Sequence, residues 1–120
     1  MLAAETTDLP PAPTFTIPIP RELAFSYSGL RSALGRMLNA EPVATQTDAR
    51  RRQLARAFVE ACVRQLELKL RLALDWCARH EQAPVTSLVV SGGVASNMFL
   101  RSRWARVERA VTCGAKTADE

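Results

Sequence analysis

Histidine and cysteine are scarce in this sequence of 120 residues, which contains one histidine and three cysteines. The cysteines, Cys62, Cys77 and Cys113, are odd in number and widely spaced, and no two of them form a CxxC pair. This pattern argues against a disulfide framework and is typical of proteins from a reducing compartment. Because His80 stands alone, a metal site made only of histidine and cysteine is also unexpected.

Long apolar runs are missing as well, since no stretch approaches the roughly 18 residues of a membrane span. Residues 1–9 contain no arginine or lysine and carry Glu5 and Asp8, so they match neither a signal peptide nor a transit peptide. We therefore expect no membrane partner and find no targeting segment in these residues.

Positive charge exceeds negative charge only mildly, with a net charge of +4 and a sequence pI of about 9.5. Such a balance suits an acidic partner such as RNA but is too small to identify one. A hydrophobic content of 48% predicts a globular chain, with room for one domain of ordinary size.

Prolines concentrate at the start of the chain, and they predict an extended lead-in over residues 1–13 because proline interrupts helices and lacks a backbone N–H. Alternating apolar residues then predict an edge strand or a polyproline-like coil over residues 14–19. A second alternation predicts a strand over residues 23–28, after which Ser28 would cap a helix.

Two helices are expected next. A one-sided apolar stripe over residues 30–38 predicts a helix that ends near Asn39 and Pro42. Thr45, with Asp48 three residues later, resembles a capping box and predicts a second helix from Asp48 to His80. At a rise of ~1.5 Å per residue this helix is about 50 Å long, which suggests that it belongs to a larger fold. We expect its core-facing residues to be Ala55, Val59, Cys62, Leu66, Leu70, Ala73 and Cys77.

The second helix begins with an arginine cluster, Arg50, Arg51 and Arg52, at a helix end where positive charge opposes the dipole. Two interpretations stay open for this cluster. It is either an RNA-facing surface or an ordinary solvated helix face, and the second is the commoner case.

The stretch LVVSGGVASN at residues 88–97 is the strongest local motif. Residues 85–91 are almost continuously apolar and predict a strand buried on both faces. Gly92 and Gly93 would let the backbone approach a ligand closely, and the start of the helix expected over residues 96–111 favours an anion. The motif predicts a phosphate-binding corner, although many such turns serve packing alone. The core-facing residues of this last helix would be Leu100, Trp104, Val107 and Val111.

Three stretches carry a resemblance to a known family: FSYSGL at residues 25–30, ARAFVEACVRQLELKLRLAL at 55–74 and LVVSGGVASNMFLR at 88–101. In this order and spacing they resemble the tRNA threonylcarbamoyladenosine synthase family, the TsaD-like proteins formerly called O-sialoglycoprotein endopeptidases. The IPIP lead-in is most similar to the mitochondrial branch of fungi. The resemblance covers residues 14–107, which is only part of a full-length family member.

The resemblance implies an α/β protein with the two-lobed actin-like ATPase fold that hexokinase also has. Residues 14–111 would form part of the C-terminal lobe, helix-rich with a few strands, and residues 112–120 an unmatched tail. The implied activity is that of an acyltransferase, which moves threonylcarbamoyl from its adenylate to the adenosine beside the anticodon of tRNA. The implied ligand is threonylcarbamoyl-adenylate or another adenine nucleotide, and the implied partner is tRNA.

The same resemblance implies that nucleotide is bound by Ser91, Gly92, Gly93 and Asn97, with a local helix cap as the alternative role of Asn97. Family members also bind one divalent metal through an HxxxH motif and a downstream aspartate. This sequence has no HxxxH motif, and Asp119 lies in unmatched surroundings. We therefore assign no metal ligand and no catalytic residue.

These departures lead us to expect an internal piece of such an enzyme that is catalytically incomplete by itself. Its further partner would be the remainder of the enzyme or a second copy of the chain. The resemblance implies a mitochondrial location, and the cytoplasm is the alternative. The competing interpretation of the chain is a non-catalytic helical module that binds RNA or a partner protein.

Overall fold

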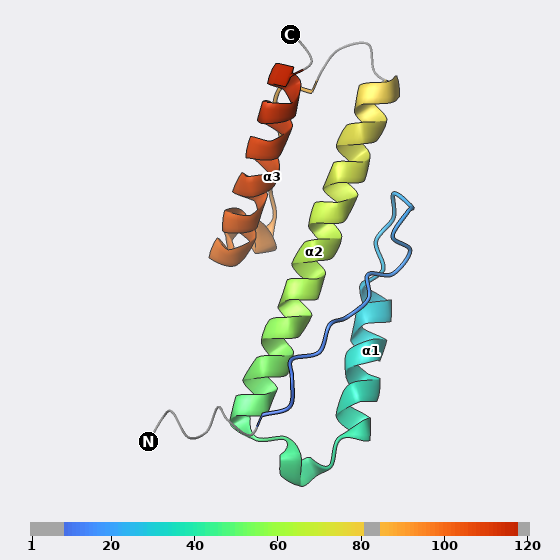
Figure 1. The fold of residues 1–120 in the computed structure, drawn as a ribbon, viewed down its shortest axis with the longest axis vertical. Helices are drawn as coiled ribbons and strands as arrows, with labels where there is room; N and C mark the ends of the chain where they lie inside the picture. Colours follow the sequence, from blue (N-terminus) through green and yellow to red (C-terminus); the bar gives the residue numbers. More distant parts are fainter. Residues whose placement is uncertain (1–8, 81–84, 118–120) are drawn as a thin grey trace. The chain divides into compact units, whose positions relative to one another are not determined.

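The structure is a computed structural model that describes residues 9–80 and 85–117, with side chains at all of these except residue 108 and residues 110–117. The first eight residues of the expected lead-in, Pro84 and Asp119 lie outside the described residues. The elements in chain order are the helix α1 (Tyr27–Ala40), the 3₁₀ turn η1 (Val43–Thr45), the helix α2 (Asp48–His80), the 3₁₀ turn η2 (Gly93–Ser96) and the helix α3 (Met98–Thr117), as Figure 1 shows. The described part of the chain is thus helical, and it contains no strand.

The helix α1 confirms the apolar stripe, but it begins earlier than predicted. Ser26, with extended backbone angles, precedes the first helical residue, so Ser28 lies inside the helix and is not its cap. The predicted strand over residues 23–28 is wrong, because residues 23–26 form no strand and the last two residues, Tyr27 and Ser28, already belong to α1. The helix ends as expected, since Pro42 disfavours helical angles at Glu41.

The bounds of α2 agree with the prediction, whereas its cap does not. The Thr47 hydroxyl accepts the backbone N–H of Arg50 at 3.2 Å, which makes Thr47 the N-cap. Thr45 is instead the last residue of η1 and donates its hydroxyl to the Pro42 carbonyl at 2.7 Å. The capping box was therefore placed two residues too early.

The chain divides into two compact units, and the first contains residues Met1–Pro20 and Ala24–Gln65. Its core is built from Phe15, Leu30 and Ala61, each at most 4% exposed. Residues 9–18, which we call the strap, run as an extended coil along α2 beside α1 (Figure 1). The Phe15 ring of the strap meets the Phe58 ring edge to face, with 6.0 Å between the centroids.

This packing corrects the predicted core face of α2. Ala55 and Val59 are exposed, while Leu54, Ala61 and Val63 are buried. The strap and α1 together cover a face of α2 that differs from its most apolar face. Polar side chains on the covered face bind the strap. The other five predicted core positions are half-buried, namely Cys62, Leu66, Leu70, Ala73 and Cys77. Burial raises the pKa of the Cys62 thiol, which packs against the core.

The coil alternative for residues 14–19 is confirmed, and the edge-strand alternative is wrong. Backbone carbonyls of the strap bind side chains of α2 rather than a neighbouring strand, as when Arg64 donates to the Phe15 carbonyl at 3.1 Å. At the start of α1, the Gln65 side chain, which is fully buried, accepts the Ser26 N–H at 2.8 Å and donates to the Ser26 carbonyl at 3.4 Å. Polar side chains of α2 thus hold the strap and the start of α1 in place through hydrogen bonds to their backbone.

The second compact unit contains residues Arg21–Leu23 and Leu66–Glu120. Arg103 of α3 forms a two-pronged ion pair with Glu67 of α2 at 2.7 and 3.0 Å, beside the buried Leu100 and Val107. The predicted strand over residues 85–91 is not formed, although the segment precedes η2 as an irregular coil. A strand requires backbone partners, and the described residues provide none, so Val85, Leu88, Val89 and Val90 are exposed.

Candidate functional site

The glycine corner, residues 88–97, lies entirely in the second unit and is shaped by Gly92. Gly92 has φ 110° and ψ 172°, a conformation that only glycine adopts readily. The chain then enters η2, where the Ala95 N–H donates to the Gly92 carbonyl at 3.1 Å. The Ser96 hydroxyl donates to the Gly93 carbonyl at 2.9 Å and closes the turn. The expected glycine turn between an apolar segment and a helix is therefore present.

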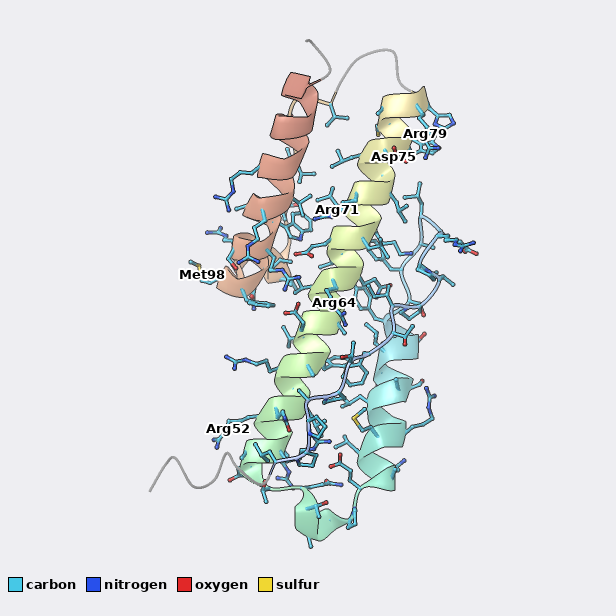
Figure 2. The ribbon with its side chains drawn as sticks, in the orientation of Figure 1. Arg52, Arg64, Arg71, Asp75, Arg79 and Met98 are labelled. Atoms are coloured by element: carbon cyan, nitrogen blue, oxygen red, sulfur yellow. The ribbon has the colours of Figure 1, made fainter. Side chains whose placement is uncertain are left out.

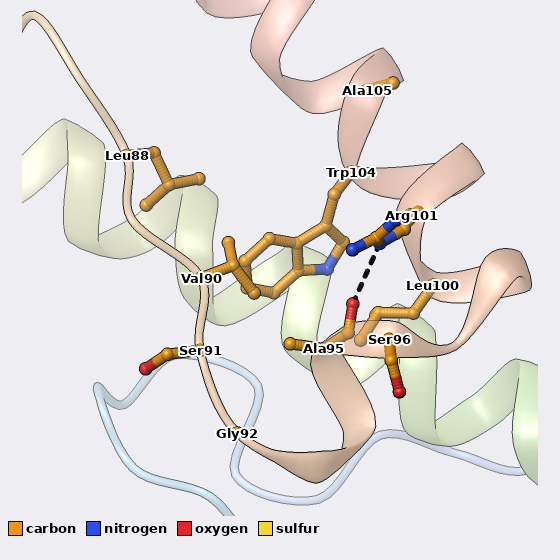
Figure 3. A pocket seen from close by; sticks show the side chains of 10 residues that line it. All are labelled: Leu88, Val90, Ser91, Gly92, Ala95, Ser96, Leu100, Arg101, Trp104 and Ala105. Carbon is orange, nitrogen blue, oxygen red and sulfur yellow. Dashed lines mark hydrogen bonds between the residues drawn. The ribbon is translucent and has the colours of Figure 1, made fainter.

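A cleft of about 510 Å³ opens between the glycine corner and α3 (Figure 3). It has an apolar wall and several polar groups, a combination typical of small-molecule sites. Its lining residues are Leu88, Val90, Ser91, Gly92, Ala95, Ser96, Leu100, Arg101, Trp104 and Ala105.

The cleft includes two of the four residues predicted to bind nucleotide, namely Ser91 and Gly92. Gly93 lies at the start of η2 and is not a lining residue, although a Cβ atom added to it would meet nothing within 4 Å. Gly93 is therefore open to the approach of another molecule. Asn97 also lies outside the lining.

Asn97 is the N-cap of α3. Its side-chain oxygen Oδ1 accepts the backbone N–H of Leu100 at 3.1 Å, and its carbonyl accepts that of Arg101 at 3.0 Å. The capping alternative for Asn97 is thus confirmed. The cap also orients the exposed side chain, because the oxygen is held against the helix and the amide nitrogen must point away from it.

Arg101 and Trp104 are the cleft residues with hydrogen-bonding side-chain nitrogens, and neither was predicted as a site residue. Arg101 is exposed on α3, and its Nε donates to the Ala95 carbonyl at 3.1 Å, which brings the guanidinium over the corner (Figure 3). Trp104 was assigned to the core, but its indole N–H is buried without a hydrogen-bond partner in the described structure. Arg101 follows Asn97 by four residues, and Trp104 follows Arg101 by three. This spacing places all three on one helix face and was the available signal in the sequence.

The predicted arginine cluster separates into residues with different roles. Arg50 is 5% exposed and binds the Glu41 carboxylate, the Gln53 side chain at 2.7 Å and the Pro11 carbonyl at 3.4 Å. This hydrogen bond from Arg50 lowers the pKa of Glu41. Arg50 is therefore not RNA-facing, because its guanidinium is enclosed by this unit. Arg51 and Arg52 are exposed, and Figure 2 shows Arg52 near the start of α2.

The described residues do not fit the divalent metal that the resemblance implies. Among the side chains that the structure describes, no three of His, Cys, Asp or Glu gather in a way that could hold a metal ion. His80 stacks on Trp76 with 4.6 Å between the ring centroids, and its Nδ1 lies 2.9 Å from the Trp76 carbonyl. No helix in the described part of the chain is long and apolar enough to cross a membrane.

Comparisons with known proteins agree with the motifs. The family model for the TsaD type of tRNA N6-adenosine threonylcarbamoyltransferase matches residues 2–116. A probable mitochondrial tRNA N6-adenosine threonylcarbamoyltransferase of Arabidopsis thaliana is 33% identical over 100 residues, which cover 74% of this chain and 21% of the relative. The chain thus spans about a fifth of the length of this relative. No solved structure matches. With a family model that matches nearly its whole length, the chain belongs to the TsaD-type tRNA N6-adenosine threonylcarbamoyltransferase family.

Proposed function

We propose that the chain is part of a tRNA N6-adenosine threonylcarbamoyltransferase and that its glycine corner binds the adenylate part of the acyl donor. In this reaction the N6 amine of the target adenosine forms a bond with the carbamoyl carbon. The bond from that carbon to the phosphate oxygen breaks, the amine loses a proton and AMP leaves. The observation that carries the proposal is the cleft beside Gly92, within the segment that the family model matches.

The side chains around the corner suit the chemistry of an adenine nucleotide. The Arg101 guanidinium can pair with a phosphate oxygen, since arginine matches phosphate geometry well. The Asn97 amide nitrogen can donate to ribose or phosphate while its oxygen caps α3. The apolar wall formed by Leu88, Val90 and Leu100 suits a base. These residues bind and orient the donor, and we assign no catalytic step to this chain because the described residues do not fit a metal.

The family also supports proposals about the partners. We propose tRNA as the acceptor, with Arg51 and Arg52 as residues that face it, because both are exposed on one helix. The remainder of an enzyme of this family, or a second copy of the chain, would complete the active site. The relative from Arabidopsis thaliana is described as mitochondrial, which supports the same location for this protein, with the cytoplasm as the alternative. The family implies the actin-like ATPase fold, of which residues 14–111 would form part of the C-terminal lobe.

Replacing Gly93 with alanine tests nucleotide binding without disturbing the fold. A Cβ atom at Gly93 meets nothing within 4 Å, and no left-handed backbone angle is found there, so Gly93→Ala should fold normally. A ligand that approaches the backbone closely would instead collide with the new methyl group. We expect AMP titrated into the full chain to shift backbone NMR signals of residues 88–101, with Gly93→Ala weakening binding about tenfold, or ~1.4 kcal/mol.

Gly35→Ala is the matched control, because Gly35 lies in α1 and also has nothing within 4 Å of an added Cβ. This control should bind AMP like the native chain. The proposal for the glycine corner would be wrong if millimolar AMP left these signals unchanged, or if Gly93→Ala bound AMP as tightly as Gly35→Ala.

A further inference from the structure

The strap is attached to α2 through its backbone and through one large side chain. Gln53 donates to the Pro10 carbonyl at 2.9 Å, and Arg64 donates to the Phe15 carbonyl at 3.1 Å. Phe15, which is 4% exposed, packs against the buried Leu30 and Ala61 and against the ring of Phe58. We call the surface formed by Leu30, Phe58 and Ala61 the Phe15 site. The strap therefore behaves as a peptide ligand of α1 and α2 that is covalently joined to them.

The join between the strap and α1 contains backbone strain. Ile19 has φ 40°, and it is the one residue other than glycine with a positive φ in the described parts of the chain. A β-branched residue is rarely found in this region, because its Cβ substituents crowd the backbone. Pro20 increases the strain at Ile19, since a residue before proline prefers extended backbone angles. Straightening the chain at Ile19 would release this strain.

The segment that would straighten lies outside the core. Residues 19–25, which we call the hinge, are all exposed, including Leu23 at 53% and Phe25 at 57%. The hydrogen bonds that close the hinge include one from the buried Lys69 to the Glu22 carbonyl at 2.6 Å. Opening would therefore break local hydrogen bonds while leaving the side chains of the Phe15 site in place.

We propose that the strap exchanges between two copies of this chain, so that the Phe15 of each copy occupies the Phe15 site of the other. The exchanged dimer would reform the same strap contacts, and Ile19 in an opened hinge would adopt the extended angles that Pro20 favours. Short hinges under strain promote this kind of exchange, because opening relieves the strain and the strap contacts reform between the two copies. The proposal is independent of nucleotide or tRNA binding.

Removing the strain at Ile19 should shift the equilibrium toward the monomer. Glycine tolerates φ 40°, so Ile19→Gly stabilises the closed hinge of the monomer. Light scattering coupled to gel filtration of the full chain should show a concentration-dependent dimer, with a dissociation constant at least about tenfold higher for Ile19→Gly. Leu23→Gly, a similar change in the hinge but away from the strained residue, is the matched control and should dimerise like the native chain. Equal effects of the two variants, or a native chain that stays monomeric at millimolar concentration, would contradict the proposal.

Mixing two complementary variants distinguishes strap exchange from any other dimer. Phe15→Ala removes the anchor but leaves the Phe15 site intact, while Ala61→Met fills the site but leaves the strap intact. Each variant alone should be monomeric, and an equimolar mixture should give a dimer that contains one copy of each. Dimers formed by either variant alone would indicate a different interface and reject strap exchange. Circular dichroism should show that both variants keep their helices. If Ala61→Met unfolds, the comparison of Ile19→Gly with Leu23→Gly tests strap exchange in its place.

Discussion

Gly92 and Gly93 are neighbours in the chain but have different structural requirements. Gly92 adopts φ 110°, which a residue with a Cβ atom adopts only under strain, whereas Gly93 has no such angle. Neither glycine has atoms within 4 Å of an added Cβ, so any cost at Gly92 comes from its backbone conformation alone. The double glycine therefore combines one residue needed for the turn with one that keeps the corner open.

Gly92→Ala should destabilise the protein by about 1–3 kcal/mol, the range typical of a strained backbone conformation. Urea denaturation followed by circular dichroism measures this free energy of unfolding. Gly93→Ala serves as the control and should differ from the native chain by less than about 0.5 kcal/mol. If the two variants were equally stable, the positive φ of Gly92 would have no energetic consequence.

The ion pair between Glu41 and Arg50 should make stability depend on pH. The hydrogen bond from Arg50 lowers the pKa of Glu41 in the folded state below its ordinary value of 4.5. This contribution is therefore fully present above the ordinary pKa and is lost as the pH falls through the lowered value of the folded state. We expect Glu41→Gln to melt at a lower temperature than the native chain at pH 7, with the difference shrinking below pH ~4.

The exposed pair of Asp75 and Arg79, near the end of α2 in Figure 2, is the control for this experiment. Both side chains are more than 60% exposed, so solvent screens their attraction, and Asp75→Asn should leave the melting temperature almost unchanged at either pH. A pH-independent effect of Glu41→Gln would show that the carboxylate charge is not what stabilises the fold.

At the level of secondary-structure elements, side-chain caps help to fix where α2 and α3 begin. Thr47 caps α2 and Asn97 caps α3, each through a side-chain oxygen that accepts a backbone N–H of the first turn. The face that α2 buries is also set by polar contacts, since Arg50, Gln65 and Lys69 are all buried on it. Each of these three binds a carbonyl of the segment before α1, which an apolar residue could not do.

Substitutions of Asn97 can separate capping from ligand binding. Asn97→Ala removes the cap and should cost about 1 kcal/mol, seen as faster amide hydrogen exchange in the first turn of α3. Asn97→Asp keeps a capping oxygen, so exchange should stay slow, but it replaces the amide donor with a negative charge that repels phosphate. AMP binding should therefore weaken in both variants. Normal AMP binding by Asn97→Asp would limit the role of Asn97 to capping.

At the level of the whole chain, the sequence matches only part of the curated relative. The chain corresponds to 21% of the Arabidopsis thaliana relative, and its described residues contain no cluster that could hold a metal. The apolar residues 85–91 remain exposed and without strand partners in the described structure. These features are consistent with a segment that supplies binding surfaces and depends on other segments for chemistry.

We expect the purified chain to transfer no threonylcarbamoyl group by itself. The test is incubation with threonylcarbamoyl-adenylate and unmodified tRNA, followed by nucleoside analysis of the digested tRNA. Modified adenosine formed above the level of a reaction without protein would show that the chain holds a complete active site.

Binding of tRNA should depend on Arg51 and Arg52 and on salt. Reversing both charges, in Arg51→Glu with Arg52→Glu, should weaken binding about tenfold or more at ~0.1 M salt and reduce the slope of affinity against salt concentration. Filter binding with unmodified tRNA measures both quantities. Arg36→Glu with Arg31→Glu, the same change of charge on the exposed face of α1, is the control. An equal loss in the two double variants would indicate attraction by net charge rather than by a defined surface.

The helices and the glycine turn follow from local sequence. Helical hydrogen bonds and apolar periodicity are local, so the bounds of α2 and the one-sided stripe of α1 could be predicted from neighbouring residues. The sharp turn at Gly92 could be predicted for the same reason, because only the local residue decides whether a positive φ is accessible. The capping role of Asn97 was also a local alternative, and its hydrogen bond to the Leu100 N–H confirms that role.

In contrast, which helix faces are buried and which charged side chains are exposed depends on contacts between distant parts of the chain. The strap lies far from α2 in sequence, so its carbonyls could not be foreseen as the partners of Gln53 and Arg64. The burial of Arg50 could not be predicted for the same reason, because its neighbours in sequence are exposed arginines and its partners lie elsewhere in the chain. The predicted strands failed for a related reason. A strand is stabilised by partners elsewhere in the chain, and the apolar character of residues 85–91 alone cannot supply them.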